Sequence, residues 1–155
     1  MLELKHIHKT FNPGTVTEKR AICDLSVTLN DGDFVTVIGG NGAGKSTMLN
    51  LIAGVYGVDE GAILLDGIDV TADPEYKRAK FLGRVFQDPM MGTAGNMGIE
   101  ENLAMAYRRG KKRGLGWGIS KEERALYREK LSMLGLGLED RLTSKVRLLS
   151  GGQRQ

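Results

Sequence analysis

The chain has 155 residues, of which 22 are Gly and only 3 are Pro. Its 41% hydrophobic and 26% charged content is typical of a globular protein, and the glycines follow no three-residue period, which excludes collagen-like, low-complexity and disordered chains. The net charge of +3 is too small to indicate nucleic-acid binding, and a single cysteine, Cys23, excludes an intrachain disulfide or a cysteine-cluster metal site.

The charge is divided unevenly along the chain. Residues 1–75 carry 5 basic and 11 acidic side chains, a net −6, and residues 76–155 carry 17 and 8, a net +9, which together give +3. This asymmetry favours an anionic partner for the second half, although helical surfaces are also rich in Lys and Arg for solubility alone. No apolar run reaches membrane-spanning length and the N-terminus lacks a signal-peptide layout, so we expect no membrane span.

Short alternating apolar runs near the start of the chain predict strands around residues 2–7 and 27–29. Residues 34–38 read Phe-Val-Thr-Val-Ile, an apolar and β-branched run that predicts a buried strand. A Gly-rich loop follows at residues 39–44.

A helix is expected over residues 46–53, with Gly54 suited to the position just after its end. Residues 62–65 predict a further strand, and Asp66-Gly67 is a hairpin-turn signal. Residues 81–86 predict another strand.

Helices dominate the pattern after Pro89. We expect a loop over residues 90–98, a helix over 99–109 and a basic, Gly-rich connection over 108–118. Ser120 and Glu123 form a capping-box signature, which begins a helix on which Tyr127, Leu131 and Leu134 share one face.

The strongest motif lies at residues 39–46, Gly-Gly-Asn-Gly-Ala-Gly-Lys-Ser, which fits the phosphate-binding pattern G-x-x-x-x-G-K-[ST]. Glycines let backbone N–H groups converge on phosphate oxygens, and the following helix points its positive end at the same anion. Lys45 supplies an ammonium group, and the Ser46 hydroxyl can bind Mg²⁺. The alternative is a flexible turn with a surface Lys, which the preceding strand and following helix argue against.

Two weaker motifs follow. In Leu-Ser-Gly-Gly-Gln at residues 149–153, Ser150 can cap a helix that begins at Gly151 or Gly152 and so form a second anion-binding end. Gln87 leaves the predicted strand end and can reach a metal ion or a water molecule. Taken alone, an ordinary capped helix and a surface Gln are the competing interpretations.

The order and spacing of the motifs carry more weight than each motif alone. Gln87 lies 42 residues after Lys45, and Ser150 lies 105 residues after it. In GGNGAGKST, VFQDP and LSGGQRQ the chain resembles the nucleotide-binding domain of ATP-binding cassette (ABC) transporters over all 155 residues.

This resemblance implies an α/β fold of the P-loop NTPase (ABC ATPase) type, with an N-terminal antiparallel β part, an incomplete RecA-like core and an α-helical subdomain. It implies a β part and P-loop core at residues 1–88, the helical subdomain at 89–149 and the start of the signature helix at 150–155.

The resemblance also implies ATP and Mg²⁺ as cofactors. The Walker A residues that would bind ATP are Gly39, Gly40, Asn41, Gly42, Ala43, Gly44, Lys45, Ser46 and Thr47. Lys45 and Gln87 would act in catalysis, and Ser46 and Gln87 would hold Mg²⁺. Phe11 is the candidate for stacking on adenine; because the insert at residues 12–20 lengthens the spacing, a packing role for Phe11 weighs equally.

The signature residues implied by the resemblance would close over the γ-phosphate bound to a second protomer, and they are Ser150, Gly151, Gly152 and Gln153. The family's Asp-Glu strand, with its general base, and its switch His would follow the signature, so the chain looks like an N-terminal fragment or a degenerate product. We expect this chain alone to bind ATP–Mg weakly or not at all and to hydrolyse none. A longer parent protein would hydrolyse ATP as a head-to-tail dimer.

The function implied is that of an ATP-binding subunit, coupling ATP hydrolysis to solute transport in a bacterial importer, of amino-acid type. Its partners would be transmembrane permease subunits and a second nucleotide-binding subunit, with no nucleic acid, on the cytoplasmic face of the membrane. Alternatives are a nucleic-acid- or translation-associated ABC ATPase, a P-loop kinase and a binding-only fragment. The five basic residues within 108–113 are either a solvated loop or a contact for lipid headgroups or an acidic transporter surface.

Overall fold

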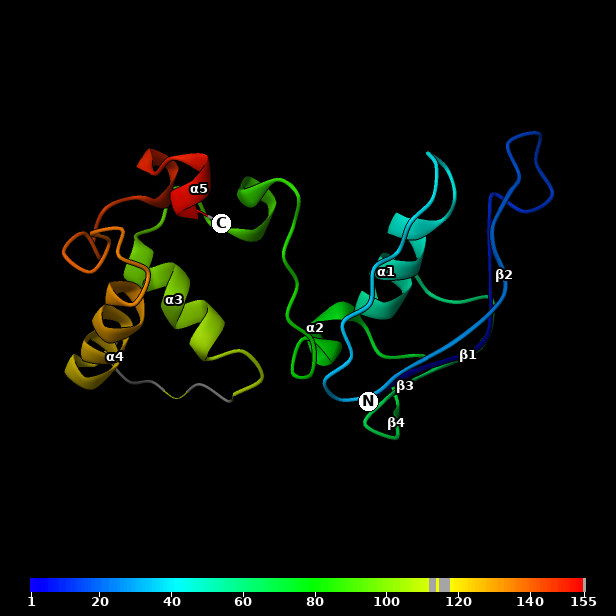
Figure 1. Cartoon of the computed structure of the whole chain (residues 1–155), viewed down its shortest axis with the longest axis horizontal. Coiled ribbons are helices and arrows are strands. Elements are labelled where there is room, and N and C mark those ends of the chain that lie inside the picture. The colour runs from blue at the N-terminus through cyan, green and yellow to red at the C-terminus, as the bar shows by residue number, and fades with distance from the viewer. Residues whose placement is uncertain (112–113, 115–117, 155) are drawn as a thin grey trace. The chain divides into compact units, whose positions relative to one another are not determined.

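A computed structural model of the chain describes residues 1–111, 114 and 118–154 (Figure 1). The chain divides into two units, Met1–Leu82 and Gly83–Gln155, and each is described by itself.

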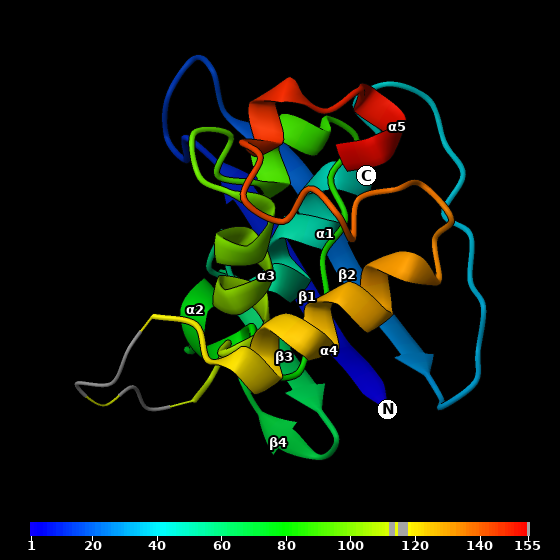
Figure 2. The same ribbon diagram turned by 90° about the vertical axis from the view of Figure 1, so that its left-hand side faces the viewer.

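Four strands of the first unit form an antiparallel sheet in the order β2-β1-β3-β4. They are β1 (Leu2–Phe11), β2 (Lys19–Leu29), β3 (Glu60–Leu65) and β4 (Ile68–Asp69). Leu4 of β1 lies opposite Val27 on one side and Ile63 on the other, so the apolar alternation seen in the sequence lines up across three strands. The β3–β4 hairpin can be followed in Figure 2. It turns at Asp66 and Gly67, whose φ angles are 50° and 76°, as the turn signal predicts.

Helix α1 (Lys45–Ala53) packs its buried Leu51 against this sheet. Gly54, with φ of 81°, ends the helix and donates its N–H to the Leu51 carbonyl oxygen at 3.1 Å, which confirms its predicted place. The buried core of the unit consists of Leu4, Ile7, Leu51, Ile63, Leu65 and Val70. A short helix, α2 (Glu75–Arg78), follows.

The strand predicted over residues 34–38 is not formed, and neither is the one over 81–86. Phe34 and Ile38 are each 92% exposed rather than buried. A strand exists only when a neighbour accepts its backbone hydrogen bonds, and no strand pairs with either segment among the described residues. The prediction of a strand was therefore wrong for both segments, and the prediction of burial was wrong for residues 34–38.

Helices make up the second unit, as the pattern predicts. They are the 3-10 turns η1 (Pro89–Gly92) and η2 (Val146–Leu148) and the α-helices α3 (Ile99–Tyr107), α4 (Lys121–Ser132) and α5 (Gly151–Arg154). The connection predicted over residues 108–118 lies partly outside the described residues. No helix in the described part of the chain is long and apolar enough to cross a membrane.

The capping box of α4 is confirmed. The Glu123 N–H donates to the Ser120 hydroxyl oxygen at 3.1 Å, and the Ser120 N–H donates to the Glu123 carboxylate at 2.8 Å. Tyr127 and Leu131 are buried against α3, but Leu134 lies beyond the end of the helix and is 59% exposed, so its predicted place on the same buried face is wrong. The buried core consists of Ile99, Ala104, Tyr127, Leu131, Leu138, Leu142, Val146 and Leu149.

Candidate functional site

The Gly-rich loop at residues 39–44 leads directly into the N-terminus of α1. Gly44 has a φ of 85°, in the left-handed region that favours glycine. A Cβ atom at Gly44 would lie 2.7 Å from the carbonyl oxygen of Ala21 and 3.0 Å from Cδ1 of Ile22. The loop therefore needs glycine at this position for its backbone angle and also because β2 approaches closely.

Lys45 is held by the loop that precedes it. Its Nζ donates to the carbonyl oxygens of Gly39 at 2.6 Å and Gly40 at 2.7 Å. An ammonium group has three N–H donors, so one remains for an incoming oxygen. The first N–H groups of α1 have no acceptor within the helix, and they form its positive end. This combination fits a phosphate group.

The predicted site offers few protein ligands for Mg²⁺. Ser46 is exposed in the first turn of α1, and that turn carries no acidic residue. Among the described residues, no group of three His, Cys, Asp or Glu side chains is placed to hold a metal ion. Mg²⁺ keeps several water ligands and often takes the rest from substrate phosphates. Ser46 therefore fits Mg²⁺ that arrives together with a phosphate chain, rather than a resident ion.

Phe11 lies at the end of β1, opposite Lys19 at the start of β2. Its ring meets the Tyr56 ring edge-on, with centroids 5.3 Å apart at 81°, and stays partly exposed. This contact gives the packing role a physical basis, and the exposed part of the ring leaves the adenine-stacking role compatible with the structure.

Gln87 belongs to the second unit, where it is exposed. It does not leave a strand end as predicted, because the preceding segment is unpaired. The next residue, Asp88, caps η1 by accepting the N–H of Met90 at 2.9 Å. The side-chain amide of Gln87 therefore lies directly before the capped 3-10 turn η1.

The signature segment forms the predicted cap in the second unit. The N–H of Ser150 donates to the side-chain oxygen of Gln153 at 3.2 Å, and the N–H of Gln153 donates to the Ser150 hydroxyl at 3.4 Å. Helix α5 begins at Gly151. The Ser and Gln of the motif thus cap the helix reciprocally, while its two glycines carry no side chain that would cover the first turn.

Arg154 is a residue of this segment that motif reasoning missed. Its guanidinium donates to the carbonyl oxygens of Val146 at 3.0 Å, Arg147 at 2.7 Å and Leu149 at 3.1 Å, and it contacts the Met90 sulfur. Arg154 thus joins helix α5 to the backbone of residues 146–149, which precede Ser150. Its place within LSGGQRQ was the available signal.

Arg78 was also missed. Its side chain is 1% exposed, and it donates to the carbonyl oxygens of Leu51 at 2.6 Å, Ile52 at 3.0 Å, Thr71 at 2.9 Å and Asp73 at 2.8 Å. Two of these oxygens belong to the last turn of α1, so a buried cation closes the end of the helix opposite the Gly-rich loop.

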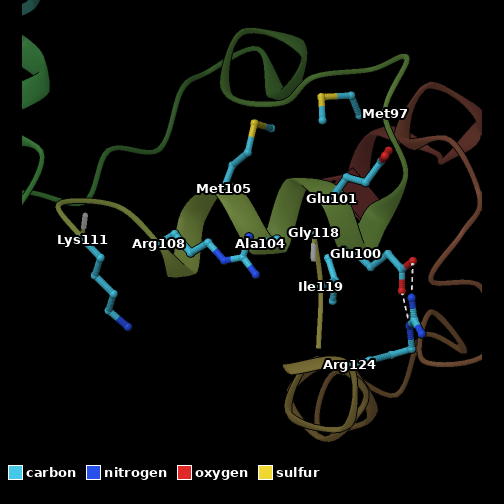
Figure 3. Close-up of a pocket in the computed structure, with 10 residues that line it drawn as sticks. All are labelled: Met97, Glu100, Glu101, Ala104, Met105, Arg108, Lys111, Gly118, Ile119 and Arg124. Atoms are coloured by element: carbon cyan, nitrogen blue, oxygen red, sulfur yellow. Dashed lines mark hydrogen bonds and ion pairs between the residues drawn. The ribbon is translucent and has the colours of Figure 1, made fainter. Parts of the chain in front are cut away.

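A cavity of about 610 Å³ lies beside α3 and α4 (Figure 3). Its lining residues are Met97, Glu100, Glu101, Ala104, Met105, Arg108, Lys111, Gly118, Ile119 and Arg124. The Arg124 guanidinium donates to both Glu100 oxygens at 2.6 and 3.0 Å, and Arg108 binds Glu123. Arg108 and Lys111 of the basic run belong to this lining, and none of the predicted ATP-binding, metal-binding or signature residues does.

The chain matches the family model described as "ABC transporter" over residues 22–155. It is 42% identical over 156 aligned positions to a tyrosine transport ATP-binding protein from Clostridioides difficile, covering 100% of this chain and 61% of that relative. It is 36% identical to the spermidine/putrescine import ATP-binding protein PotA of Haemophilus influenzae, again over 100% of this chain but 37% of the relative.

Solved structures give the same fold. The dimeric, post-hydrolysis structure of the ATP-binding cassette MJ0796 bound to ADP and Pi superimposes with a TM-score of 0.78 at 31% identity, covering 99% of this chain and 65% of that one. A nucleotide-free ATP-binding cassette from an ABC transporter superimposes with a TM-score of 0.72 at 28% identity, covering 99% and 60%. The α/β fold with an antiparallel sheet and a helical part is that of these cassettes. The chain thus spans less than two thirds of the length of these relatives.

Proposed function

This chain belongs to the ABC transporter family, and from that premise we propose that it binds the phosphates of ATP at residues 39–47 as part of a transporter's energy-coupling subunit. The observation that carries the proposal is the state of Lys45. Its ammonium is held by two loop carbonyls and keeps a third donor, beside the open N-terminus of α1.

The chemistry proposed for the whole protein is transfer of the γ-phosphoryl group of ATP to water. Lys45 and the backbone N–H groups of the loop would stabilise the charge that develops on the phosphoryl oxygens. Ser46 would bind the Mg²⁺ that accompanies ATP, and Gln87 would contact this ion or the attacking water. Ser150 and the two glycines after it would close over the γ-phosphate held by a second protomer.

For this 155-residue chain by itself we propose weak ATP–Mg binding and no turnover. Of the two proposed protein ligands for Mg²⁺, Ser46 lies in a turn without a carboxylate and Gln87 belongs to the second unit. The described residues also include no cluster of acidic side chains around the loop. Weak binding without turnover is also what a binding-only role predicts.

The proposed partners are a second nucleotide-binding subunit and transmembrane permease subunits at the cytoplasmic face of the membrane, with no nucleic acid. The dimeric cassette among the solved relatives supports the first partner. The proposed cargo is an amino-acid-type solute taken up by a bacterial importer. The tyrosine transport name of a relative at 42% identity supports this class of cargo.

The experiment titrates the chain with ATP–Mg up to about 10 mM, and displacement of a fluorescent ATP analogue reports binding. A separate assay measures phosphate release. We expect saturable binding that Lys45→Ala removes and that Lys5→Ala, an exposed lysine on β1, preserves. Binding of equal strength in the Lys45→Ala chain would contradict the proposed site. Phosphate release that depends on Lys45 would contradict the proposed lack of turnover.

A further inference from the structure

A second lysine lies at the Gly-rich loop. Lys19 begins β2 and pairs directly with Phe11 of β1, so the two side chains share one face of the ribbon. A methyl group placed on Gly42 would lie 3.6 Å from the Lys19 Nζ. The ammonium of Lys19 therefore reaches the loop from the side of Phe11, whereas Lys45 reaches it from α1.

Among the described residues, no carboxylate forms an ion pair with this ammonium. Lys5 pairs with Glu3 at 3.0 Å and Lys9 with Asp59 at 2.7 Å. Within residues 1–111, 114 and 118–154, Lys19 makes no ion pair and no side-chain hydrogen bond. A paired cation is already neutralised by its partner, whereas an exposed and unpaired one beside an anion-binding loop increases the positive potential there.

The adjacent carboxylate is engaged elsewhere. Glu18 accepts the backbone N–H of Gly14 at 2.7 Å, within the loop that joins β1 and β2. That contact keeps Glu18 in the loop. The register of β2 instead directs Lys19 to one face and its neighbour Arg20, which pairs with Thr10, to the opposite face.

We propose that Lys19 binds the α-phosphate of the nucleotide, an inference that rests on the proposed nucleotide site. In this pose the base lies at Phe11 and the β- and γ-phosphates lie at Lys45. The α-phosphate, which is nearest the ribose, then lies beside the Lys19 ammonium. Lys19 thus contributes equally to binding of ATP and ADP and sets nucleotide affinity rather than γ-phosphate discrimination.

The test compares the affinities of ATP–Mg and ADP–Mg for the wild-type chain, Lys19→Met, Lys19→Arg and Arg20→Met. Arg20→Met is the matched control, because it removes the same charge one residue away on the opposite face. We expect Lys19→Met to weaken both nucleotides by about fivefold to tenfold, since an exposed charge-assisted contact is lost. Lys19→Arg and Arg20→Met should stay within about twofold of wild type.

The outcomes separate this inference from the function beneath it. Nucleotide binding that Lys45→Ala removes but Lys19→Met leaves unchanged overturns the role of Lys19 alone. A loss confined to ATP places Lys19 at the γ-phosphate and also overturns the inference. Equal losses of affinity in Lys19→Met and Arg20→Met would show that only the net charge matters, and this also overturns the inference. A wild-type chain that binds no nucleotide overturns both proposals. Circular dichroism of each variant checks that the strands are intact.

Discussion

The Nη1 of Arg78 donates to the carbonyl oxygen of Leu51 at 2.6 Å, a buried hydrogen bond between residues 27 positions apart. It joins the segment after the sheet to the end of the helix that follows the Gly-rich loop. Burial lowers the pKa of the Arg78 guanidinium, and the nearby Asp73 and Asp69 oppose that change. The group keeps its charge, which suits the negative end of α1.

Replacing Arg78 with Met should destabilise the first unit, because the buried carbonyl oxygen of Leu51 and three partly buried ones lose their donor. We expect a loss of about 2–4 kcal/mol in the free energy of unfolding, measured by urea titration. Lys80→Met, a nearby exposed charge, is the control and should change stability by less than about 0.5 kcal/mol. Equal stability of the two variants would show that Arg78 is not a structural tie.

A methyl group at Gly44 should disrupt the loop. In Gly44→Ala the new Cβ would lie 2.7 Å from the Ala21 carbonyl oxygen, and the backbone would keep a left-handed φ. We therefore expect the free energy of unfolding, measured by thermal unfolding, to fall by about 1–3 kcal/mol. Gly40→Ala is the matched comparison, since a Cβ there meets nothing within 4 Å. A greater loss of stability in Gly40→Ala than in Gly44→Ala would contradict this role of Gly44.

The stability of the helical unit should depend on pH through Glu123. Arg108, and after it the N–H of Ser120, holds the pKa of Glu123 below its usual range. A carboxylate with a lowered folded-state pKa contributes stability that is complete above its unfolded pKa of about 4.3 and is lost as the pH falls through the folded-state value. Glu123→Gln should therefore be less stable than wild type at neutral pH, and the two should converge in acid.

Hydrogen exchange of residues 121–132 measures this difference directly. Glu129→Gln, an exposed carboxylate on the same helix, is the control and should follow the wild type across the pH range. A difference between wild type and Glu123→Gln that persists unchanged below the folded-state pKa would contradict the role of the carboxylate.

The exposed run at residues 34–38 should make the chain self-associate. Phe34 and Ile38 are each 92% exposed, at the two ends of one unpaired five-residue apolar segment. Replacing both with Lys should reduce association in sedimentation experiments and leave the unfolding free energy within about 0.5 kcal/mol. Val16→Lys, at an isolated exposed apolar residue, should not alter association. Equal effects of the two changes on association would show that residues 34–38 are not a specific site of self-association.

Local signals in the sequence predicted local structure well. The capping box at Ser120, the turn at Asp66-Gly67 and the C-terminal Gly54 each depend on a few adjacent residues, and each is found. Residues 34–38 have the composition of a buried strand, but pairing depends on a neighbour elsewhere, which composition cannot supply.

The motif reasoning found the loop and the signature but not the residues that support them. Arg78 is a buried arginine, and burial of an arginine is too unusual to expect from a pattern. The position of Lys19 follows from the register between β1 and β2, which no spacing rule fixes across the connecting residues 12–18. Both positions depend on contacts between residues far apart in the sequence.

The most direct test of nucleotide binding is an amide NMR titration of the 155-residue chain with ATP–Mg up to about 10 mM. We expect saturable chemical-shift changes concentrated at residues 39–47, with Lys19 among the next most affected residues, and we expect Lys45→Ala to abolish them. The same shifts in Lys45→Ala, or no shift at the loop, would contradict the proposed site.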